Sequence, residues 1–316
     1  MGRRRTLGNF SSLVSGFLSN PGYTLMRGVA RFKILRNAVI FARERSGKGL
    51  YKSYINNLDT LVNDSVFNSL DRHKFVDELE KNGVAFGLKL SAEVVSEIND
   101  WSMNCVTYAD REPQYGFYLH ERERAEAALE KPILLSQYFN TTTQCPAIQR
   151  LATDPVLLWI ATAYMKSIPT FVGANLWWTF PVDALESDRD KHAHVFHKDV
   201  DDFKFFKFFF YLTDVPIGEG AHVCVIGSHL NPPNNRLTDP WLIRRYDDDE
   251  IASFYSSDHI KEICGKAGDG FAENTMCIHK GSTPRSEARL LLQLQFAMFD
   301  HGAMHDSRPA EELARL

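Results

Sequence analysis

The sequence predicts a mainly-β domain with helices around it, built as an antiparallel barrel or jelly roll. After about residue 170, short β-forming runs alternate with turns, and no helical stretch separates them. Aromatic residues reach 12%, with 22 Phe among 316 residues, which favours a sheet-rich interior. The 44% hydrophobic and 24% charged residues are ordinary for a globular protein, which excludes wholesale disorder and a coiled-coil rod.

The first 70 residues are predicted to form a basic helical extension of a domain that covers residues 71–316. Residues 1–55 contain eleven Lys and Arg and one acid, Glu44, so they carry a net charge of +10, whereas the rest carries −14. Apolar residues recur at roughly helical spacing between Met26 and Phe41. Two interpretations stay open: a helical layer packed on the main domain, or a surface for anionic partners such as phospholipid head groups or a phosphorylated glycolipid. No nucleic-acid-binding motif accompanies the charge, so nucleic acid is not an expected partner.

Helices are predicted over residues 71–81, from Ser91 onward and over 156–165, with a strand over 84–88. Asn82-Gly83 is a stop signal for the first helix, and Ser91 is a capping residue for the second. Asp154-Pro155 starts the third helix with a capping carboxylate and a proline in the first turn. That helix is almost wholly apolar, so we expect it to be buried.

Further strands are predicted over residues 171–180, 194–199, 203–212, 221–226, 271–279 and 290–296, with turns at 216–220, 231–234 and 268–270. The strand over 203–212 carries aromatic residues on both faces. We therefore expect it to be covered on both sides.

The five Cys residues include no C-x-x-C pair, which fits neither a disulfide framework nor a zinc finger. Their pattern indicates a reducing, cytoplasmic setting. The sequence contains no run of about 18 apolar residues, so we expect no membrane-spanning helix. We expect a cytoplasmic protein, with peripheral membrane contact through residues 1–55 as the alternative to a purely structural role for that segment.

The candidate metal site starts from His197 and Asp199, two residues apart in a predicted strand. Residues i and i+2 of a strand point to the same face, about 6.6 Å apart along the chain, so the two side chains can converge on one ion. His279, at the end of another predicted strand, is the candidate third ligand. Two histidines and one carboxylate form the facial triad of non-haem Fe(II) oxygenases, which leaves coordination positions open. These three are the candidate metal-binding and catalytic residues.

Arg289 follows His279 by ten residues and adds a cosubstrate site. Its guanidinium can bind a carboxylate through two parallel hydrogen bonds, which lysine cannot match. The cosubstrate 2-oxoglutarate has such a carboxylate at one end and a metal-chelating keto acid at the other. The four residues together predict a site that uses Fe(II), 2-oxoglutarate and O₂.

These residues resemble the phytanoyl-CoA dioxygenase-like family of Fe(II)/2-oxoglutarate oxygenases. The resemblance covers about residues 70–300 and rests on the following segments: Phe196 to Asp199, residues 211–215, Gly220 to His229, and His279 to Gly281 followed by Arg289. It implies a double-stranded β-helix (a cupin-like jelly roll) flanked by N-terminal and inserted helices. It also implies that His197, Asp199 and His279 bind iron and that Arg289 binds 2-oxoglutarate. The strand before the His-x-Asp pair lines the cosubstrate pocket in the family, which adds Asn175 and Trp177 as candidates for 2-oxoglutarate binding.

Two positions bear on the reaction that the resemblance implies. Lys198 stands where the family often has Gln, and we expect no change of chemistry because that side chain faces away from the metal. Asp199 is kept where related halogenases have Ala or Gly, which indicates hydroxylation, with desaturation or ring closure as alternatives. The expected substrate is a small molecule or a lipid-linked compound, and the basic N-terminal region favours an anionic one.

Several charged residues have two open interpretations. Lys207 is either a barrel-end lysine that reaches out to solvent or a ligand for an acidic group of substrate or cosubstrate. His194 is a substrate-binding candidate, and with His192 it is otherwise expected to be an exposed histidine at a loop edge or part of a second metal site. The remaining residues are expected to be structural, surface or solvated residues: His222, His229, His301, His305, Asp201 and Asp202.

Two other functions compete with the oxygenase. A cupin-like metal-binding barrel of another class would need no carboxylate clamp, so Arg289 argues against it. A non-catalytic scaffold that docks through its basic N-terminus would need no metal triad, so the presence of all three candidate ligands argues against that.

Overall fold

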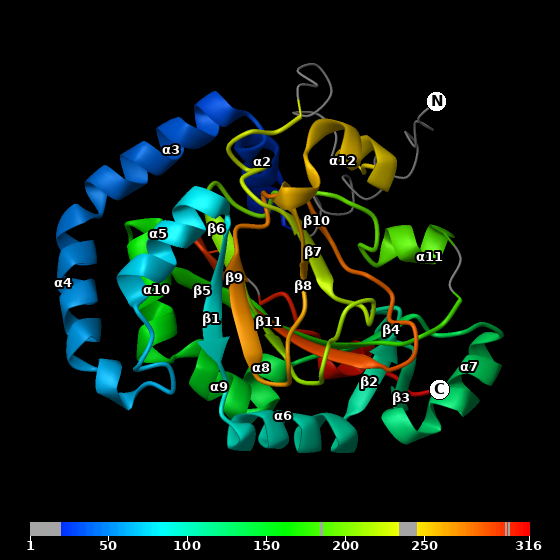
Figure 1. Cartoon of the computed structure of the whole chain (residues 1–316). Helices are drawn as coiled ribbons and strands as arrows, with labels where there is room; N and C mark the ends of the chain where they lie inside the picture. The colour runs from blue at the N-terminus through cyan, green and yellow to red at the C-terminus, as the bar shows by residue number, and fades with distance from the viewer. Residues whose placement is uncertain (1–19, 184–185, 234–244, 301, 303) are drawn as a thin grey trace.

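The computed structural model describes residues 20–183, 186–233, 245–300, 302 and 304–316 (Figure 1). The segment 1–19, residue Asn234 of a predicted turn, and His301 lie outside this set. In the described part, helices pack around two antiparallel sheets. None of the described helices combines the length and the apolar character needed to cross a membrane.

The basic N-terminal region forms three consecutive helices: α2 (Pro21–Ala30), α3 (Lys33–Ser46) and α4 (Lys48–Thr60). The helical structure predicted there is confirmed for these residues. Figure 1 shows α3 and α4 as a long arc beside the sheets, and α4 packs on α10 (Pro155–Met165). Leu58 is the buried residue of α4 and belongs to the main core.

The capping signals predict three helix ends correctly. Helix α5 (Arg72–Asn82) begins after Asp71, whose carboxylate accepts from the Lys74 amide, and ends at Gly83 with φ +75°. A Cβ there would meet Cys277 Sγ, so glycine is required twice over. The Ser91 hydroxyl accepts from the Val94 amide at the start of α6 (Ala92–Asn104). Asp154 caps α10, which is buried along nearly its whole length.

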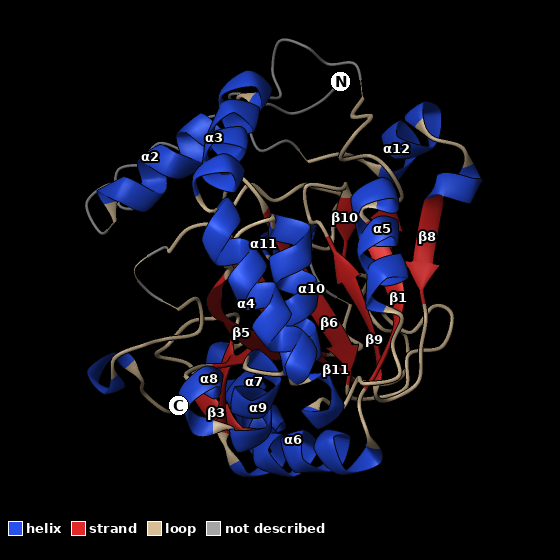
Figure 2. Ribbon diagram, turned by 90° about the vertical axis from the view of Figure 1, so that its left-hand side faces the viewer, coloured by secondary structure: helices blue, strands red, loops and turns tan. Residues whose placement is uncertain are grey.

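The large sheet has eight strands in the order β1-β9-β6-β11-β5-β4-β2-β3, and every pairing is antiparallel. Its strands are β1 (Val84–Lys89), β2 (Val106–Ala109), β3 (Gly116–Tyr118), β4 (Leu135–Tyr138), β5 (Thr170–Thr179), β6 (Phe205–Tyr211), β9 (Asp269–Glu273) and β11 (Arg289–Ala297). Figure 2 shows α4 and α10 in front of the central strands. The small antiparallel sheet contains β10 (His279–Lys280), β7 (His222–Val225) and β8 (Ile260–Ile263). The strands predicted over 84–88, 171–180, 203–212, 221–226 and 290–296 are confirmed.

Shorter helices complete the described chain: η1 (Val62–Asp64), η2 (Leu119–Glu121), α7 (Arg122–Leu129), α8 (Thr141–Gln144), α9 (Pro146–Ala152), α11 (Glu186–Lys191), α12 (Asp248–Phe254), η3 (Ser257–His259) and η4 (Ala310–Glu312).

The central strands β5, β6 and β11 are covered on both faces, as predicted for residues 203–212. Alternate side chains point to opposite faces of a strand. One set is apolar and joins the main core with α10: Ala174, Leu176, Trp178, Phe206, Phe208, Phe210, Leu290, Leu292 and Leu294. The other set faces the small sheet across a cavity, and that cavity holds the candidate site.

Two of the predicted strands are wrong in extent or existence. Residues 194–199 form no strand, only single bridges from Phe196 to Tyr246 and from His197 to His279. The stretch 271–279 is broken between β9 and β10, because the Asn274 side chain accepts from the Met276 amide and the Cys277 amide bonds back to the Asn274 carbonyl. An asparagine that bonds two residues ahead favours a turn over a continuous strand.

Candidate active site

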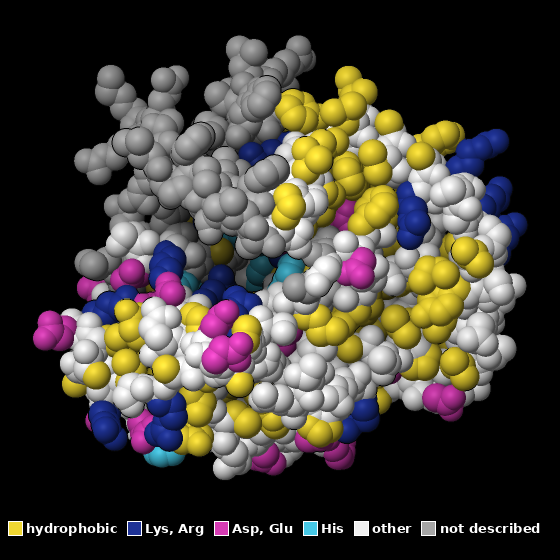
Figure 3. Space-filling view, turned by 180° about the vertical axis from the view of Figure 1, so that it is seen from behind, with side chains coloured by type: hydrophobic (Ala, Val, Ile, Leu, Met, Phe, Trp, Pro, Cys, Tyr) yellow, Lys and Arg dark blue, Asp and Glu magenta, His cyan; other side chains and the backbone are white. Residues whose placement is uncertain are grey.

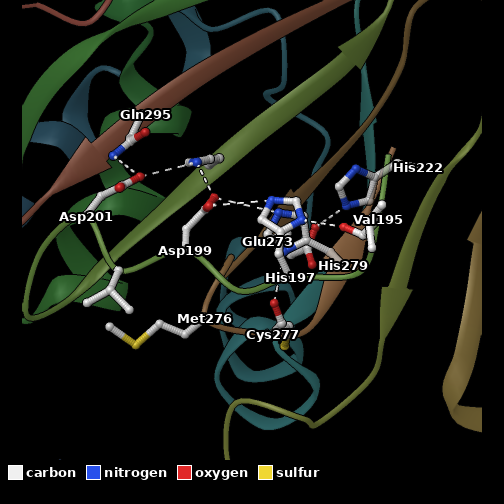
Figure 4. Close-up of polar contacts among 12 residues, drawn as sticks. Val195, His197, Asp199, Asp201, His222, Glu273, Met276, Cys277, His279 and Gln295 are labelled. Atoms are coloured by element: carbon white, nitrogen blue, oxygen red, sulfur yellow. Dashed lines mark hydrogen bonds and ion pairs between the residues drawn. The ribbon is translucent and has the colours of Figure 1, made fainter. Parts of the chain in front are cut away.

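His197, Asp199 and His279 lie together, as the sequence predicts. One potential ligand atom from each lies within 4.8 Å of the others. The two Asp199 oxygens lie 3.7 Å from His197 Nε2 and 3.6 Å from His279 Nε2, and Figure 4 shows the carboxylate pointing at both rings. Two imidazole nitrogens and one carboxylate oxygen form a set that suits a divalent transition metal such as Fe(II). The donor set therefore fits the metal that the sequence predicts.

The backbone brings the two histidines together without a regular strand. His197 and His279 exchange both of their backbone hydrogen bonds, at 2.9 and 2.8 Å. Their ring centroids lie 4.3 Å apart. The Asp199 amide donates to the Thr275 carbonyl at 2.8 Å, which holds the carboxylate beside the pair. The spacing of two residues predicted convergence correctly, although a bridge and not a strand produces it.

The ring orientation leaves both Nε2 atoms available for a metal. Nδ1–H of His197 donates to the Val195 carbonyl at 2.9 Å, and Nδ1–H of His279 donates to the Cys277 carbonyl at 2.9 Å (Figure 4). A carbonyl only accepts, so each Nδ1 carries the proton and each neutral ring keeps its lone pair on Nε2. Burial, together with the neighbouring His279, holds the pKa of His197 well below its ordinary value.

Lys207 lies inside the protein, which excludes one of its two open interpretations, the barrel-end lysine that reaches out to solvent. Its side chain is 9% exposed, and Nζ lies 2.6 Å from Asp199 Oδ2 and 3.4 Å from Asp201 Oδ2. Burial opposes the charged forms of this pair. The carboxylates nevertheless raise the pKa of Lys207, and Lys207 with the two imidazoles holds the pKa of Asp199 well below its usual value. The expectation of a solvated Asp201 is also wrong, because a buried lysine requires such partners.

Arg289 is the first residue of β11, and its side chain is buried in the wall of the same cavity. One terminal nitrogen donates to the Gly220 carbonyl, and Nη2 donates to Thr179 Oγ1 at 3.0 Å. Nε is buried with no hydrogen-bond partner among the described residues. A buried, unpartnered guanidinium donor is costly, and a bound carboxylate would satisfy it. Arg289 therefore fits the 2-oxoglutarate carboxylate that the sequence assigns to it.

The cavity has a volume of about 290 Å³. It is lined by the triad, Lys207, Arg289 and also Arg111, Gln137, Asn175, Trp177, His192, Ala193, His194, Asp201, Phe209, His222, Gly281, Leu291, Gln293, Gln295 and His305. Asn175 and Trp177, the two weaker cosubstrate candidates, are therefore in the wall, and Asn175 Oδ1 accepts from Gln137 Nε2 at 2.9 Å. His194 lies there too, with Nδ1 at 2.9 Å from Thr283 Oγ1.

Several residues that were expected to be exposed are buried or line the cavity. His192 is buried and bonds Asp110 at 3.0 Å, and His305 is half-buried in the wall, so neither is the exposed surface histidine that was expected. Asp202 is fully buried, with its carboxylate bound to the Phe203 and Phe299 amides. His229, predicted to be structural, contacts Cys277 outside the cavity wall.

His222 was expected to be structural, but it lines the cavity and stacks on His279 with centroids 5.4 Å apart. Its Nε2 lies 2.5 Å from Glu273 Oε2. Burial and the nearby Arg289 lower the pKa of His222 to about 3, and burial raises the pKa of Glu273 to about 8. Both shifts favour the uncharged forms of the pair. The alternation of β7 residues could have indicated this orientation, but not the partner.

The chain matches no protein-family model and no curated protein. Among solved structures it is similar to the epimerase SnoN from nogalamycin biosynthesis in complex with Fe³⁺, α-ketoglutarate and nogalamycin RO, at 18% identity and a TM-score of 0.49 over 71% of this chain and 82% of that chain. It is also similar to HygX from Streptomyces hygroscopicus with nickel, 2-oxoglutarate and hygromycin B bound, at 13% identity and a TM-score of 0.48 over 75% and 92% of the two chains. A third is EvdO2 from Micromonospora carbonacea var. aurantiaca complexed with 2-oxoglutarate, at 15% identity and a TM-score of 0.48 over 76% and 96%. At such identities the likeness concerns the chain path alone, so we infer the function from the cavity residues.

Proposed function

We propose that this chain is an Fe(II)/2-oxoglutarate-dependent dioxygenase that hydroxylates an unactivated C–H bond of a small-molecule or lipid-linked substrate. One observation supports this most: the ligand atoms of His197, Asp199 and His279 converge in the wall of the cavity that Arg289 also lines. With Fe(II) bound, the overall chemistry takes 2-oxoglutarate, O₂ and the substrate C–H to succinate, CO₂ and C–OH. The retained Asp199 supports hydroxylation over halogenation, because halide would need the position that the carboxylate fills.

Arg289 would hold the far carboxylate of 2-oxoglutarate. A guanidinium has five N–H donors, and the Gly220 carbonyl and Thr179 Oγ1 take two of them. Nε–H and the remaining terminal hydrogens are left for a carboxylate. The two protein contacts fix the plane of the guanidinium before the ligand arrives, which reduces the entropy lost on binding.

Lys207 would neutralise Asp201 once the metal takes Asp199. The ammonium lies between the two carboxylates, 2.6 Å from one and 3.4 Å from the other. If a metal binds Asp199, the Lys207 ammonium loses that carboxylate as a partner and keeps Asp201. Trp177, Phe209 and Leu291 supply an apolar part of the wall, which limits water beside the metal site.

The architecture that goes with this proposal is a double-stranded β-helix. The large and small sheets are both antiparallel and both contribute to the cavity, β6 and β11 from one and β7 and β10 from the other. We propose residues 71–316 as this oxygenase domain and residues 1–70 as its basic extension, in a cytoplasmic setting.

Anaerobic titration with Fe(II) and then 2-oxoglutarate tests the proposal. A keto acid chelated to iron through open positions gives a weak charge-transfer band in the visible. We expect the band in the wild-type chain and its loss in His279→Ala. Arg289→Ala should still bind iron but require at least about tenfold more 2-oxoglutarate to develop the band. His259→Ala, an exposed histidine outside the cavity wall, is the matched control and should behave as wild type.

A folded, iron-loaded wild-type chain without the band would overturn the oxygenase assignment and favour a metal-binding barrel of another class. Circular dichroism of each variant separates that outcome from misfolding. Substrate candidates can then be screened by succinate release, with product mass separating hydroxylation from desaturation or ring closure.

A further inference from the structure

An exposed face of α3 and α4 combines apolar and basic side chains in a way that the proposed reaction does not use. Ile34 is 85% exposed, Phe41 65% and Leu50 69%. Exposed cations lie among them in the sequence, and none forms an ion pair with an acidic side chain of the described residues: Lys33, Arg45, Lys48 and Lys52. We call these seven residues the basic helix face.

The exposed apolar residues are not part of the core-facing side of α3. Val39 and Ile40 pack inward, against the cluster that contains Val200 and Phe203. Ile34 and Phe41 are seven residues apart, so they share one side of the helix, and Arg45 continues that side toward α4. Helix α3 therefore has two apolar sides, and the described part of the chain covers one of them. An apolar side with no cover in a folded chain marks an interaction site.

The charge of this face has no internal balance. Glu44 is the one acid between residues 21 and 58, and it turns inward to pair with Lys204 Nζ at 3.1 Å. Figure 3, seen from behind, shows yellow and dark blue side chains together at the upper right, the side where Figure 1 places α3 and α4 at its left. The face therefore presents positive charge and apolar groups together.

We propose that the basic helix face docks on an anionic lipid bilayer. Interfacial helices bury Leu- and Phe-type side chains at the head-group boundary while Lys and Arg meet anionic lipids. A nucleic acid would use the cations but would leave Ile34 and Phe41 exposed. A second copy of the chain would bring like charges together, which opposes self-association through this face.

The same helical layer reaches the candidate metal site. Arg27 on α2 donates from Nε to the Val200 carbonyl at 2.9 Å, and its Nη2 lies 3.8 Å from Asp201. Val200 and Asp201 directly follow the candidate ligand Asp199. Docking would thus bring the helical layer that contacts this segment to the lipid surface. The docking itself does not depend on the oxygenase proposal.

Vesicle co-sedimentation of the full chain tests the docking. Vesicles of phosphatidylcholine with about 40% phosphatidylglycerol are compared with vesicles of pure phosphatidylcholine. Each comparison is made at about 100 mM ionic strength and at a lower ionic strength, because salt shortens the distance over which charges interact. We expect binding to the anionic vesicles, weaker binding at higher salt, and little binding to the neutral ones. Each cation near an anionic bilayer strengthens binding about fivefold, so Arg45→Glu with Lys48→Glu should weaken it at least about 25-fold. Ile34→Glu with Phe41→Glu should weaken it at least about tenfold.

Two controls match these variants. Ile217→Glu changes an 82% exposed apolar residue elsewhere, and Arg124→Glu with Lys81→Glu makes the same charge change on α7 and α5. Both should bind vesicles as wild type or, for the charge control, within about threefold, because they lie off the proposed face. Since every substituted side chain is exposed, thermal unfolding should show all variants folded.

Three results would overturn the proposal. The first is a wild-type chain that sediments with neither vesicle or equally with both. The second is loss of binding on deletion of residues 1–19 while the Ile34 and Phe41 substitutions have no effect. The third is a dimer in analytical ultracentrifugation that those substitutions convert to a monomer. None of these measurements uses iron or turnover, so a failed oxygenase assignment would leave the outcome unaffected.

Discussion

The two faces of β5, β6 and β11 differ sharply, although the same strands supply both. Toward α10, the side chains are apolar throughout, from Leu292 and Leu294 to Phe206 and Phe208. Toward the cavity, the same strands present polar groups beside the apolar Trp177, Phe209 and Leu291. The polar residues are Asn175, Lys207, Arg289, Gln293 and Gln295. The alternation of a β-strand allows this division with no change of backbone.

The comparison shows where stability and chemistry reside. Buried apolar side chains stabilise the fold in proportion to the area removed from water. Buried polar groups cost free energy unless they are paired, and Arg289 Nε and Gln295 Oε1 are unpaired among the described residues. The unpaired polar groups on the cavity face thus destabilise the fold, and a ligand that pairs with them can remove this cost. Substitutions on the two faces should therefore have opposite signatures.

Phe208→Ala should have the largest effect on stability. Phe208 is fully buried and packs edge-on to Phe206, with centroids 4.8 Å apart, and to Phe296 at 5.8 Å. Removing a buried Phe ring costs about 3–5 kcal/mol of unfolding free energy. Urea unfolding should show this loss, while the metal affinity of the folded fraction stays as in wild type. Gln293→Ala, on the opposite face, should cost less than about 1 kcal/mol, and an equal loss in both variants would contradict the comparison.

Lys207→Met tests how much stability the fold loses when buried carboxylates on the cavity face lack their cation. Without the ammonium, Asp199 and Asp201 lose the cation that lies 2.6 and 3.4 Å away. Breaking a buried ion pair from one side costs about 3 kcal/mol or more, so the metal-free variant should be less stable by that amount. Mn²⁺, a redox-stable divalent ion, should restore part of the loss by binding Asp199. Urea unfolding with and without Mn²⁺ should show a larger metal-induced gain in Lys207→Met than in wild type, and an equal gain would count against Lys207 and the metal sharing this carboxylate.

The sequence predicts local features and face assignments well. Gly83 ends the helix that it was expected to end, and Ser91 and Asp154 cap the helices that they were expected to cap, because a cap needs only residues a few positions apart. The convergence of His197, Asp199 and His279 was predictable because the first two lie two residues apart and a second histidine completes a known set of ligand types. Strand alternation also placed Lys207 with Phe209 on one face, which is the cavity face.

The partners of buried charges were not predictable, because they come from distant segments. Both interpretations of Lys207 stayed open, since nothing in the sequence links β6 to the loop that carries Asp201. Glu273 meets His222 only because β9 and β7 belong to facing sheets. Residues 194–199 form no strand because Phe196 bridges to Tyr246 and His197 to His279, so no single neighbouring segment continues the pairing.

Asp110→Asn should show that a buried carboxylate behind the polar cavity wall, in contact with the lining residue His192, is structural, which would limit the comparison. Asp110 bonds Lys131 and His192, and its side chain is 4% exposed. Burial would raise the pKa of Asp110, but His192 and Lys131 lower it to about 2. A carboxyl whose folded pKa lies below its unfolded value of about 3.9 stabilises the fold above that value and loses this contribution as the pH falls toward 2.

The wild type should therefore be about 2 kcal/mol more stable than Asp110→Asn at pH 7, and the difference should vanish near pH 2. Asn tolerates the positive φ of +56° at this position, so backbone strain does not add to the effect. Urea unfolding of both chains across this pH range measures the difference. A gap that stays constant with pH would show that the carboxylate charge is not what stabilises this wall.

Thr179→Val should have the smallest effect of these substitutions. It tests a single contact of one cavity residue, Arg289. Thr179 is a fully buried residue at the end of β5, and its Oγ1 accepts from Arg289 Nη2 at 3.0 Å. Valine keeps the volume and removes the acceptor, so the guanidinium loses one of its two protein contacts. A hydrogen bond to a charged group contributes about 1.5–3 kcal/mol, of which a bound carboxylate can recover part. We expect 2-oxoglutarate affinity to fall about three- to tenfold with Mn²⁺ affinity unchanged, measured by calorimetry under anaerobic conditions. An unchanged 2-oxoglutarate affinity would mean that the Gly220 carbonyl alone orients Arg289, and a parallel loss of Mn²⁺ affinity would mean that Thr179 supports the whole cavity rather than this one side chain.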